Sequence, residues 1–336
     1  MTDPNQRRRF LHQATAAGLA MSLGDQARSQ ATQPEWPQAL VRLIVPYPVG
    51  GATDILARLI GRGIAARIGQ QLLFDTRAGA GGMIGIGAMA KAAPDGHTFG
   101  VIGVSQVITA PFLFEKVPYD TDRDISFVTL LATVPMVLAV HPSVPVQTAT
   151  ELMQHLKRHK GKLSYGSVAT GHYGHVASEH INATYDAGMV HVPYKGEAPM
   201  LQDLLANQLP LSFVTIATAK PQVEAGKLRL LAITGTRRHP SMPNLPTFAE
   251  QGLDADVFKM NPGWIGIGAP AKTPTAVVRR MASETVAAAR EPEVFERIAA
   301  LGMDFVGNTP EAFAETYRAE KPIWQKLLKQ AGIRPE

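Results

Sequence analysis

The chain contains no cysteine, so it can form neither a disulfide nor a thiolate metal site. It also lacks a long hydrophobic run, because no segment after residue 31 approaches the roughly 18 consecutive apolar residues of a membrane-crossing helix. After residue 32 there is no block of Lys or Arg with interleaved aromatic residues. We therefore expect neither thiol chemistry nor a nucleic-acid partner.

The first 31 residues are typical of an export signal. Arg7–Leu11 has the twin-arginine form, and the mildly apolar run Ala14–Leu23 suits a signal sequence but is too short to span a bilayer. Ser29–Ala31 places small residues where a signal peptidase reads them, so we expect cleavage after Ala31. The alternative is an ordinary basic amphipathic helix. The sequence predicts a periplasmic protein exported by a twin-arginine-type signal.

Removal of this segment changes both length and charge. It leaves 305 of the 336 residues, which suits about two domains. The segment holds four of the 33 Lys and Arg residues and two of the 28 Asp and Glu residues, so the formal charge falls from +5 to +3. The mature protein is thus only weakly basic.

Strand-like and helix-like segments alternate along the chain. This alternation predicts an α/β fold with mostly parallel sheets. The helix over residues 54–68 has Thr53 as its expected N-cap, and Thr309-Pro310-Glu311 is expected to open the last helix. Strands are expected at Arg42–Val45, Leu72–Phe74, Thr98–Gly103, Val137–Val140, Leu163–Gly166, Met189–Val192, Leu211–Phe213, Leu228–Thr234 and Trp264–Gly268.

Two segments resemble crossings between domains, namely Thr133–Met136 and Lys259–Gly263. About 120 residues with their own alternation lie between them. We therefore expect one lobe from residues 32–136 and 262–336, and a second lobe from residues 137–261. A ligand cleft is expected between the lobes.

Two glycine-rich turns about thirty residues apart predict an anion site. They are Val45–Asp54 and Asp75–Gly85, and each follows a short β-branched run and precedes a helical pattern. Glycine allows close backbone approach to a ligand, and a helix start offers unpaired N–H groups with a positive dipole. A carboxylate is favoured over a phosphate because the usual phosphate signatures are missing.

A third loop, Gly166–Tyr173, has the glycine spacing of a P-loop but lacks its essential lysine. It follows a strand and opens a helix, so its backbone N–H groups and the hydroxyls of Ser167 and Thr170 could hold a carboxylate. A plain strand-to-helix connection is the alternative.

Other chemistries have weaker support. Gly85–Ala90 matches a loose dinucleotide fingerprint, but no clear strand precedes it directly. His155 and His159 are one helical turn apart, yet a third metal ligand would have to be assumed. Neither Ser105 nor Ser167 lies in a nucleophile elbow. We expect no cofactor, no metal and no catalysis.

The chain resembles the Bug-type solute receptors, the extracytoplasmic subunits of tripartite tricarboxylate transporters. The resemblance covers nearly the whole mature chain. It is carried by Pro46–Asp54, Arg77–Gly82, Pro94–Thr98, Val117–Asp120, His191–Gly196, Ala225–Arg229, Leu245–Glu250, Ala269–Pro274 and Gly307–Glu311.

Some positions depart from the family pattern. Thr76-Arg77-Ala78 stands where the family usually has Asn-Arg-Pro, and Val107 and Ala110 replace a His and an Asn. Ala169 and His172 replace a Gly and a Ser, and Val214 follows Phe213 where Asp is common. This drift favours an aromatic ligand or a monocarboxylate over the common dicarboxylates.

The resemblance implies a two-lobed periplasmic-binding-protein fold with two crossovers (type II) and a ligand cleft between the lobes. It implies a receptor that is not an enzyme, captures a small organic carboxylate and passes it to membrane transporter subunits; we expect a monomer. The alternatives are an orphan receptor that feeds a sensor system and an exported hydrolase that uses Ser167 with nearby histidines. The expected ligand-binding residues are Tyr47, Pro48, Gly50, Gly51, Ala52, Thr53, Asp54, Ser105, Ser167, Ala169, Thr170, His172 and Lys195.

His172 is the most specific of these expectations. At a helix N-terminus the dipole disfavours the charged imidazole, so the side chain should be neutral near pH 7 in the empty protein. A bound carboxylate would favour the charged imidazole and so oppose the effect of the dipole.

Overall fold

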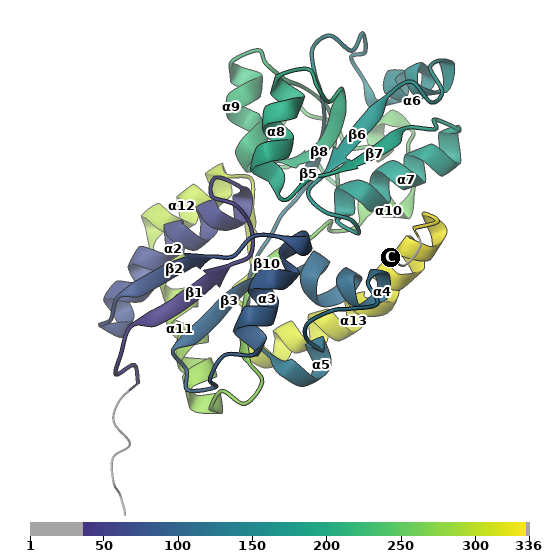
Figure 1. Cartoon of the computed structure of the whole chain (residues 1–336). Coiled ribbons are helices and arrows are strands. Elements are labelled where there is room, and N and C mark those ends of the chain that lie inside the picture. The colour runs from purple at the N-terminus through teal and green to yellow at the C-terminus, as the bar shows by residue number, and fades with distance from the viewer. Residues whose placement is uncertain (1–35, 334–336) are drawn as a thin grey trace, which may run out of the picture. The chain divides into compact units, whose positions relative to one another are not determined.

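The computed structural model describes residues 36–333, of which those from Ala39 onward belong to one compact unit (Figure 1). The expected signal, residues 1–31, lies outside the described residues. Two β-sheets flanked by helices make up the unit and confirm the α/β class. Within residues 36–333, no helix has both the length and the apolar character needed to cross a membrane.

The larger sheet has six strands in the order β11-β4-β10-β3-β1-β2. Strands β1, β2 and β3 are parallel, whereas β10 is antiparallel to β3 and β4, and β11 is antiparallel to β4. The strands are β1 (Val41–Val45), β2 (Leu72–Thr76), β3 (Thr98–Gly103), β4 (Ile125–Thr133), β10 (Trp264–Pro270) and β11 (Asp304–Phe305).

Helices cover both faces of the six-stranded sheet. Helices α2, α11 and α12 pack against one another on one face, and α3 and α13 lie on the other (Figure 1). The helices are α2 (Ala52–Ile68), α3 (Met83–Ala90), α4 (Ala110–Leu113), α5 (Thr121–Asp124), α11 (Thr275–Ala289), α12 (Pro292–Ala300) and α13 (Pro310–Gln330).

The smaller sheet has five strands in the order β7-β6-β8-β5-β9. Strands β7, β6 and β8 are parallel, and β5 is antiparallel to β8 and β9. Its elements are β5 (Met136–Val140), α6 (Ala149–Arg158), β6 (Ser164–Ser167), α7 (Tyr173–Tyr185), β7 (Val190–Pro193), α8 (Glu197–Leu205), β8 (Leu211–Thr215), α9 (Ile216–Glu224), β9 (Arg229–Ile233) and α10 (Asp256–Lys259).

Both sheets are mixed, so the expectation of mostly parallel sheets is wrong. The reason lies in the crossings between them. Strand β10 returns from the smaller sheet and inserts antiparallel between β3 and β4, and β5 enters the smaller sheet antiparallel to both its neighbours.

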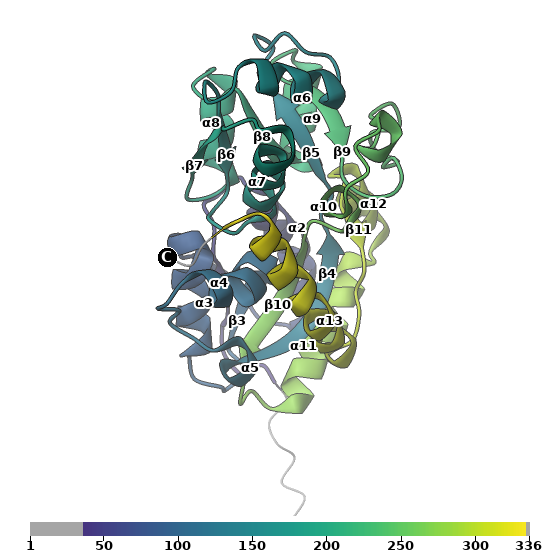
Figure 2. The same ribbon diagram turned by 90° about the vertical axis from the view of Figure 1, so that its right-hand side faces the viewer.

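The chain passes between the sheets twice, from β4 to β5 and from α10 to β10. The two crossings lie side by side, because the Val134 N–H donates a hydrogen bond of 2.9 Å to the Gly263 carbonyl. Helix α13 adds a further link, since it contacts α7 of the smaller sheet (Figure 2). There Trp324 meets Tyr173 edge to face, with ring centroids 6.4 Å apart.

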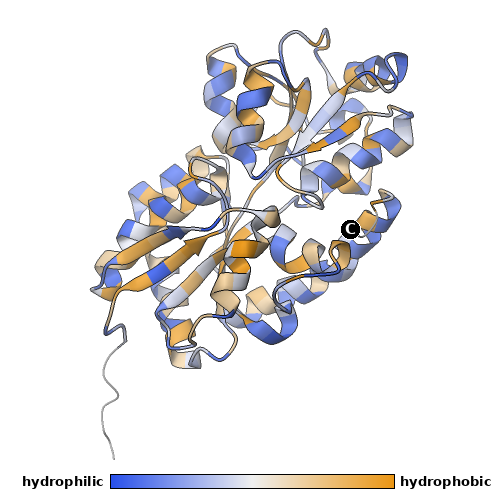
Figure 3. Cartoon of the chain, viewed as in Figure 1, coloured by the Kyte–Doolittle hydropathy of each residue, from blue (hydrophilic) through white to orange (hydrophobic). Residues whose placement is uncertain are grey.

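Apolar strands form the interior, and the outer faces of the helices are hydrophilic (Figure 3). The largest buried cluster draws residues from both sheets, including Ile102 of β3 and Phe213 of β8. The two sheets therefore share packed apolar surface in this conformation.

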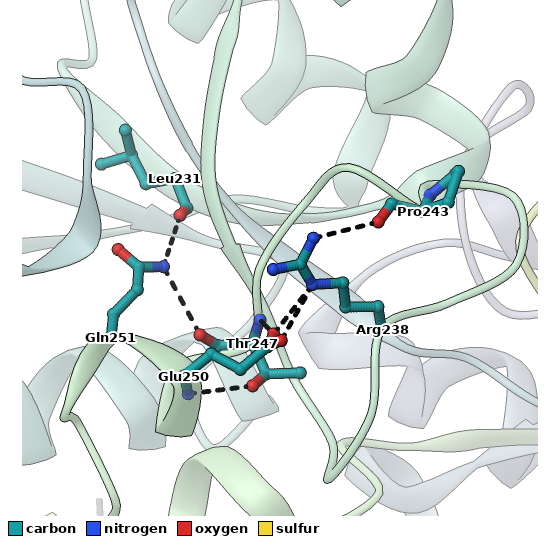
Figure 4. A network of polar contacts seen from close by, with 6 residues as sticks. All are labelled: Leu231, Arg238, Pro243, Thr247, Glu250 and Gln251. Atoms are coloured by element: carbon teal, nitrogen blue, oxygen red, sulfur yellow. Dashed lines mark hydrogen bonds and ion pairs between the residues drawn. The ribbon is translucent and has the colours of Figure 1, made fainter.

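A polar network holds the connection between β9 and α10 against the smaller sheet (Figure 4). Glu250 accepts hydrogen bonds from Arg238 Nε at 2.9 Å and from the Thr247 N–H at 2.7 Å. Gln251 Nε2 donates to the Leu231 carbonyl of β9 at 2.8 Å. These bonds give a segment with little regular structure a defined course.

Candidate functional site

A cavity lies between the two sheets and is lined from both. Its walls come from the β1–α2 turn, the end of β3, the β6–α7 loop and the starts of α8 and α9. Six of the thirteen expected site residues line it: Tyr47, Gly51, Ala52, Thr53, Ser105 and His172. The other seven do not: Pro48, Gly50, Asp54, Ser167, Ala169, Thr170 and Lys195.

The β1–α2 turn is shaped by Asp54. Its carboxylate is 2% exposed and accepts the Gly50 N–H at 3.1 Å and Arg58 Nε at 2.8 Å. Helix α2 begins at Ala52 with Gly51 as its N-cap, so the expectation that Thr53 caps this helix is wrong. The Asp54 carboxylate accepts the Gly50 N–H of its own turn. Thr53 therefore lies in the first turn of α2 and on the cavity wall.

Gln106 joins the two glycine-rich turns, and sequence reasoning missed it. Its Nε2 donates to Tyr47 Oη and to the Gly81 carbonyl, the latter at 3.0 Å. Its Oε1 accepts the Gly103 N–H at 2.9 Å. Burial raises the pKa of Tyr47 to about 12, so this phenol is neutral and can act as a hydrogen-bond donor.

Ser105 begins a five-residue π-helix, Ser105–Thr109, directly after β3. Its carbonyl accepts the Thr109 hydroxyl at 3.1 Å. π-Helical turns are rare and frequently occur at functional sites. Ser105 lines the cavity.

His172 is the N-cap of α7 and lines the cavity. Its side chain accepts the Gly174 N–H at 3.4 Å. Burial lowers its pKa to about 4, so the imidazole is neutral near pH 7. The direction agrees with the sequence-based expectation, but the cause is loss of solvent rather than the helix dipole.

Ser167 lies behind the cavity wall and is 1% exposed. Its Oγ is 3.0 Å from the Ala169 carbonyl and 2.6 Å from His191 Nε2. The His191 ring stacks on His175 with centroids 3.8 Å apart. Burial is the main cause that lowers the pKa of His175 to about 3 and that of His191 to about 4.

His175 and His191 thus serve packing and hydrogen bonding. His155 and His159 also stack on each other, with centroids 4.2 Å apart. No group of three or more His, Asp or Glu side chains within residues 36–333 is arranged to hold a metal ion.

Lys195 and Pro48 lie near the cavity but outside it. Lys195 is exposed. Pro48 packs against Gly196 of the smaller sheet's lobe, where a Cβ would lie only 2.6 Å from Pro48 Cδ. Pro48 therefore contributes to contact between the two halves of the cleft.

Glu197, the first residue of α8, is a second feature that sequence reasoning missed. It lines the cavity and is 6% exposed. Its carboxylate accepts the Thr215 N–H at 2.6 Å and the Thr218 hydroxyl at 2.7 Å. It also accepts the Ala52 N–H at 3.5 Å, which is a contact across the cleft.

The rest of the wall is mostly apolar and aromatic. No Lys or Arg side chain belongs to the described lining. Trp264 lines the cavity, and its Nε1 donates to Glu320 Oε2 at 2.9 Å. The apolar wall residues include Val101, Ile102, Met136, Val168, Tyr173, Trp264 and Trp324.

Such a cavity suits an organic molecule with an apolar body and few polar groups. Polar recognition would come from Tyr47, Ser105 and His172, and from those backbone N–H groups of the β1–α2 turn that Asp54 and Glu197 leave free. An anion can be held by such donors without a basic side chain.

Comparison with known proteins agrees with this arrangement. Residues 56–333 match the model of the tripartite tricarboxylate transporter family receptor. A protein of Pseudomonas sp. strain P51 from the tcbD–tcbE intergenic region is 36% identical over 96% of this chain and 94% of its own.

Two solved structures share the fold. Rpa4515 of R. palustris with adipate is 33% identical, with a TM-score of 0.86 over 90% of this chain and 100% of its own. The periplasmic binding protein BugD is 29% identical, with a TM-score of 0.84 over 90% of this chain and 100% of its own. The fold is that of these solute-binding receptors, and the chain belongs to the tripartite tricarboxylate transporter receptor family.

Proposed function

We propose that this protein is a periplasmic receptor that binds a small organic carboxylate and delivers it to the membrane subunits of a tripartite tricarboxylate-type transporter. The observation that carries the proposal is a cavity whose described wall has neutral donors but no basic side chain. The adipate in Rpa4515 supports the same ligand class. Export by residues 1–31 and a monomeric state are parts of the proposal.

The two lobes of the proposal are residues 32–136 with 262–336, and residues 137–261. The six expected residues on the cavity wall contact the ligand in this proposal. Gln106 joins them through Tyr47. The apolar wall favours an aromatic or monocarboxylate ligand, because charged ends would lose hydration there without a compensating cation.

Calorimetry and thermal-shift measurements with a panel of carboxylates test this function. We expect at least one carboxylate to raise the unfolding temperature and to bind with one-to-one stoichiometry. Mass spectrometry of ligand released on denaturation should recover an unaltered carboxylate. Stabilisation by sugars or nucleotides alone would refute the proposal.

The short Ser167–His191 contact keeps an exported hydrolase as a second candidate. Two features weigh against it. Ser167 is buried behind the cavity wall, and a histidine with a pKa of about 4 is a weak general base near neutral pH. Turnover of ester or amide substrates that disappears in Ser167→Ala would favour the hydrolase.

Delivery to a sensor system is the alternative to delivery to a transporter. Uptake of the identified ligand by cells that lack the membrane subunits separates the two roles. Loss of uptake supports transport. Unchanged uptake, with loss of a transcriptional response when the receptor itself is absent, supports sensing.

A further inference from the structure

Glu197 is the one formally charged side chain in the described cavity wall. Its oxygens accept four hydrogen bonds, from the Thr215 N–H, the Thr215 and Thr218 hydroxyls and the Ala52 N–H. The two backbone N–H groups can only donate, so the carboxylate accepts at both oxygens.

Three helix N-termini meet at this carboxylate. Glu197 is the first residue of α8, Thr215 is the N-cap of α9, and Ala52 is the first residue of α2. Each helix presents a positive dipole end to the same point. This convergence is what an anionic ligand group would require, and the protein fills it with its own side chain.

The Ala52 contact places the charge inside the cleft. It joins α2, which covers the six-stranded sheet, to α8, which covers the five-stranded sheet. It is also the longest of the four bonds, at 3.5 Å. The Ala52 N–H was expected to face a ligand, and in this structure it faces Glu197.

The remaining wall cannot neutralise a second negative charge near Glu197. His172 is neutral near pH 7 and no Lys or Arg side chain lines the described cavity. Two negative charges a few ångströms apart repel strongly in a partly buried site. A ligand with carboxylates at both ends would have one of them close to this side chain.

We propose that Glu197 occupies the anion position formed by the three helix N-termini, so that the protein selects a ligand with one carboxylate and an uncharged or cationic opposite end. This inference rests on the proposed function and names the ligand class within it. Glu197 is then a specificity-determining residue that rejects dicarboxylates.

Matched ligands of equal chain length test the inference by calorimetry. The pairs are adipate with hexanoate, succinate with butyrate, and terephthalate with 4-methylbenzoate. The corresponding ω-amino acid is added to each straight-chain pair. For the pair that binds best, the wild-type protein should bind the monocarboxylate at least about tenfold more tightly than the dicarboxylate. The ω-amino acid should bind no more weakly than the monocarboxylate.

Two variants remove the charge in different ways. Glu197→Gln keeps the size of the side chain, and Glu197→Ser opens the three helix N-termini to the ligand. Both should shift the ratio of dicarboxylate affinity to monocarboxylate affinity by about tenfold in favour of the dicarboxylate, whatever they do to overall affinity. Glu224→Gln is the matched control, because it removes an exposed negative charge from α9 in the same lobe, and it should change neither affinity.

The wild-type protein alone can overturn the inference, whether or not the variants fold. Tighter binding of dicarboxylates than of their matched monocarboxylates would do so. An unchanged preference in folded Glu197 variants, checked by thermal unfolding, would also do so. If no carboxylate binds in any pair, it is the proposed function itself that fails.

Discussion

The histidines of the smaller sheet illustrate how burial sets the behaviour of single residues. His172, His175 and His191 all have pKa values lowered chiefly by loss of solvent. They are consequently neutral hydrogen-bonding groups near pH 7. His172 faces the cavity, whereas the other two support the β6–α7 loop from behind, since the Gly171 N–H donates to His175 Nδ1 at 3.1 Å.

Ligand affinity should respond to pH through His172. A bound carboxylate would raise its pKa from about 4, so binding takes up a proton between the lower and the raised value. Affinity should be flat from about pH 8 to about pH 6 and should increase as the pH falls towards about 5. Calorimetry across this range should show the increase in the wild-type protein and a flat profile in His172→Ser. Equal profiles would place His172 outside the ligand contacts.

Stability should fall in acid for the same physical reason. The folded-state pKa values of His175 and His191 lie below the ordinary value of 6.5, so the unfolded chain binds more protons as the pH falls. The free energy of unfolding is therefore highest above about pH 6.5. Below that pH it falls by about 1.4 kcal/mol per pH unit for each of these two histidines. Urea unfolding should show a shallower pH slope in His175→Gln. An unchanged slope would contradict the burial argument.

Some site residues could be predicted from sequence and others could not. Tyr47, Gly51 and Ala52 lie in a glycine-rich turn after a strand, and such turns carry a local signal. Glu197 has no such signal, because its partners Ala52 and Thr215 are 145 and 18 residues away. A carboxylate in the first turn of a helix is ordinary by itself. Only the meeting of three helices gives it a role.

At the level of elements, two helix starts with the same sequence signature have different caps. Thr309 caps α13 as expected, with its side chain accepting the Ala312 N–H at 3.3 Å. Thr53 has the same sequence signature but lies inside α2, because the Asp54 carboxylate binds the Gly50 N–H and Arg58 instead.

These two threonines form a matched pair for stability measurements. Thr309→Ala removes a capping hydrogen bond and should lower the free energy of unfolding by about 1 kcal/mol. Thr53→Ala removes no cap and should cost less than about 0.5 kcal/mol. Chemical denaturation of both variants provides the comparison. Equal losses would show that Thr53 caps α2 after all.

The sequence predicts the positions of strands that alternate with helices. It does not predict how segments distant in sequence pair to complete each sheet. Strand β1 was expected at Arg42–Val45 and spans Val41–Val45. Strand β4 was missed, although Ile125–Thr133 is largely apolar, and the π-helix at Ser105–Thr109 was also missed. The insertion of β10 between β3 and β4 depends on contacts more than 130 residues apart in sequence.

At the level of the whole molecule, close contacts across the cleft characterise this conformation. A Cβ at Gly171 of the β6–α7 loop would overlap Leu113 Cδ1 of α4, and one at Gly81 would lie 3.3 Å from Ala169 Cβ. Such contacts leave little room for a side chain between the halves, so glycine at position 171 permits the halves to meet.

Gly171→Ala should therefore weaken closure more than folding. Gly226→Ala is its control, since Gly226 has a similar φ of +68° against +75° but no atom within 4 Å of a built Cβ. Both variants should lose about 1 kcal/mol of stability from backbone strain. Only Gly171→Ala should weaken ligand binding and enlarge the ligand-saturated protein in small-angle X-ray scattering. Equal binding in both variants would argue against closure at this contact.

The hydrogen bond between Val134 and Gly263 has a mechanical consequence. Two chain segments joined in this way can bend together without breaking the bond. A twist of one segment about the other would separate the donor from its acceptor. In the proposed two-lobed arrangement, the bond favours a hinge motion across the paired segments over a twist about them. Under the proposed function, a membrane partner that contacts both lobes would detect bound ligand as a change in one hinge angle.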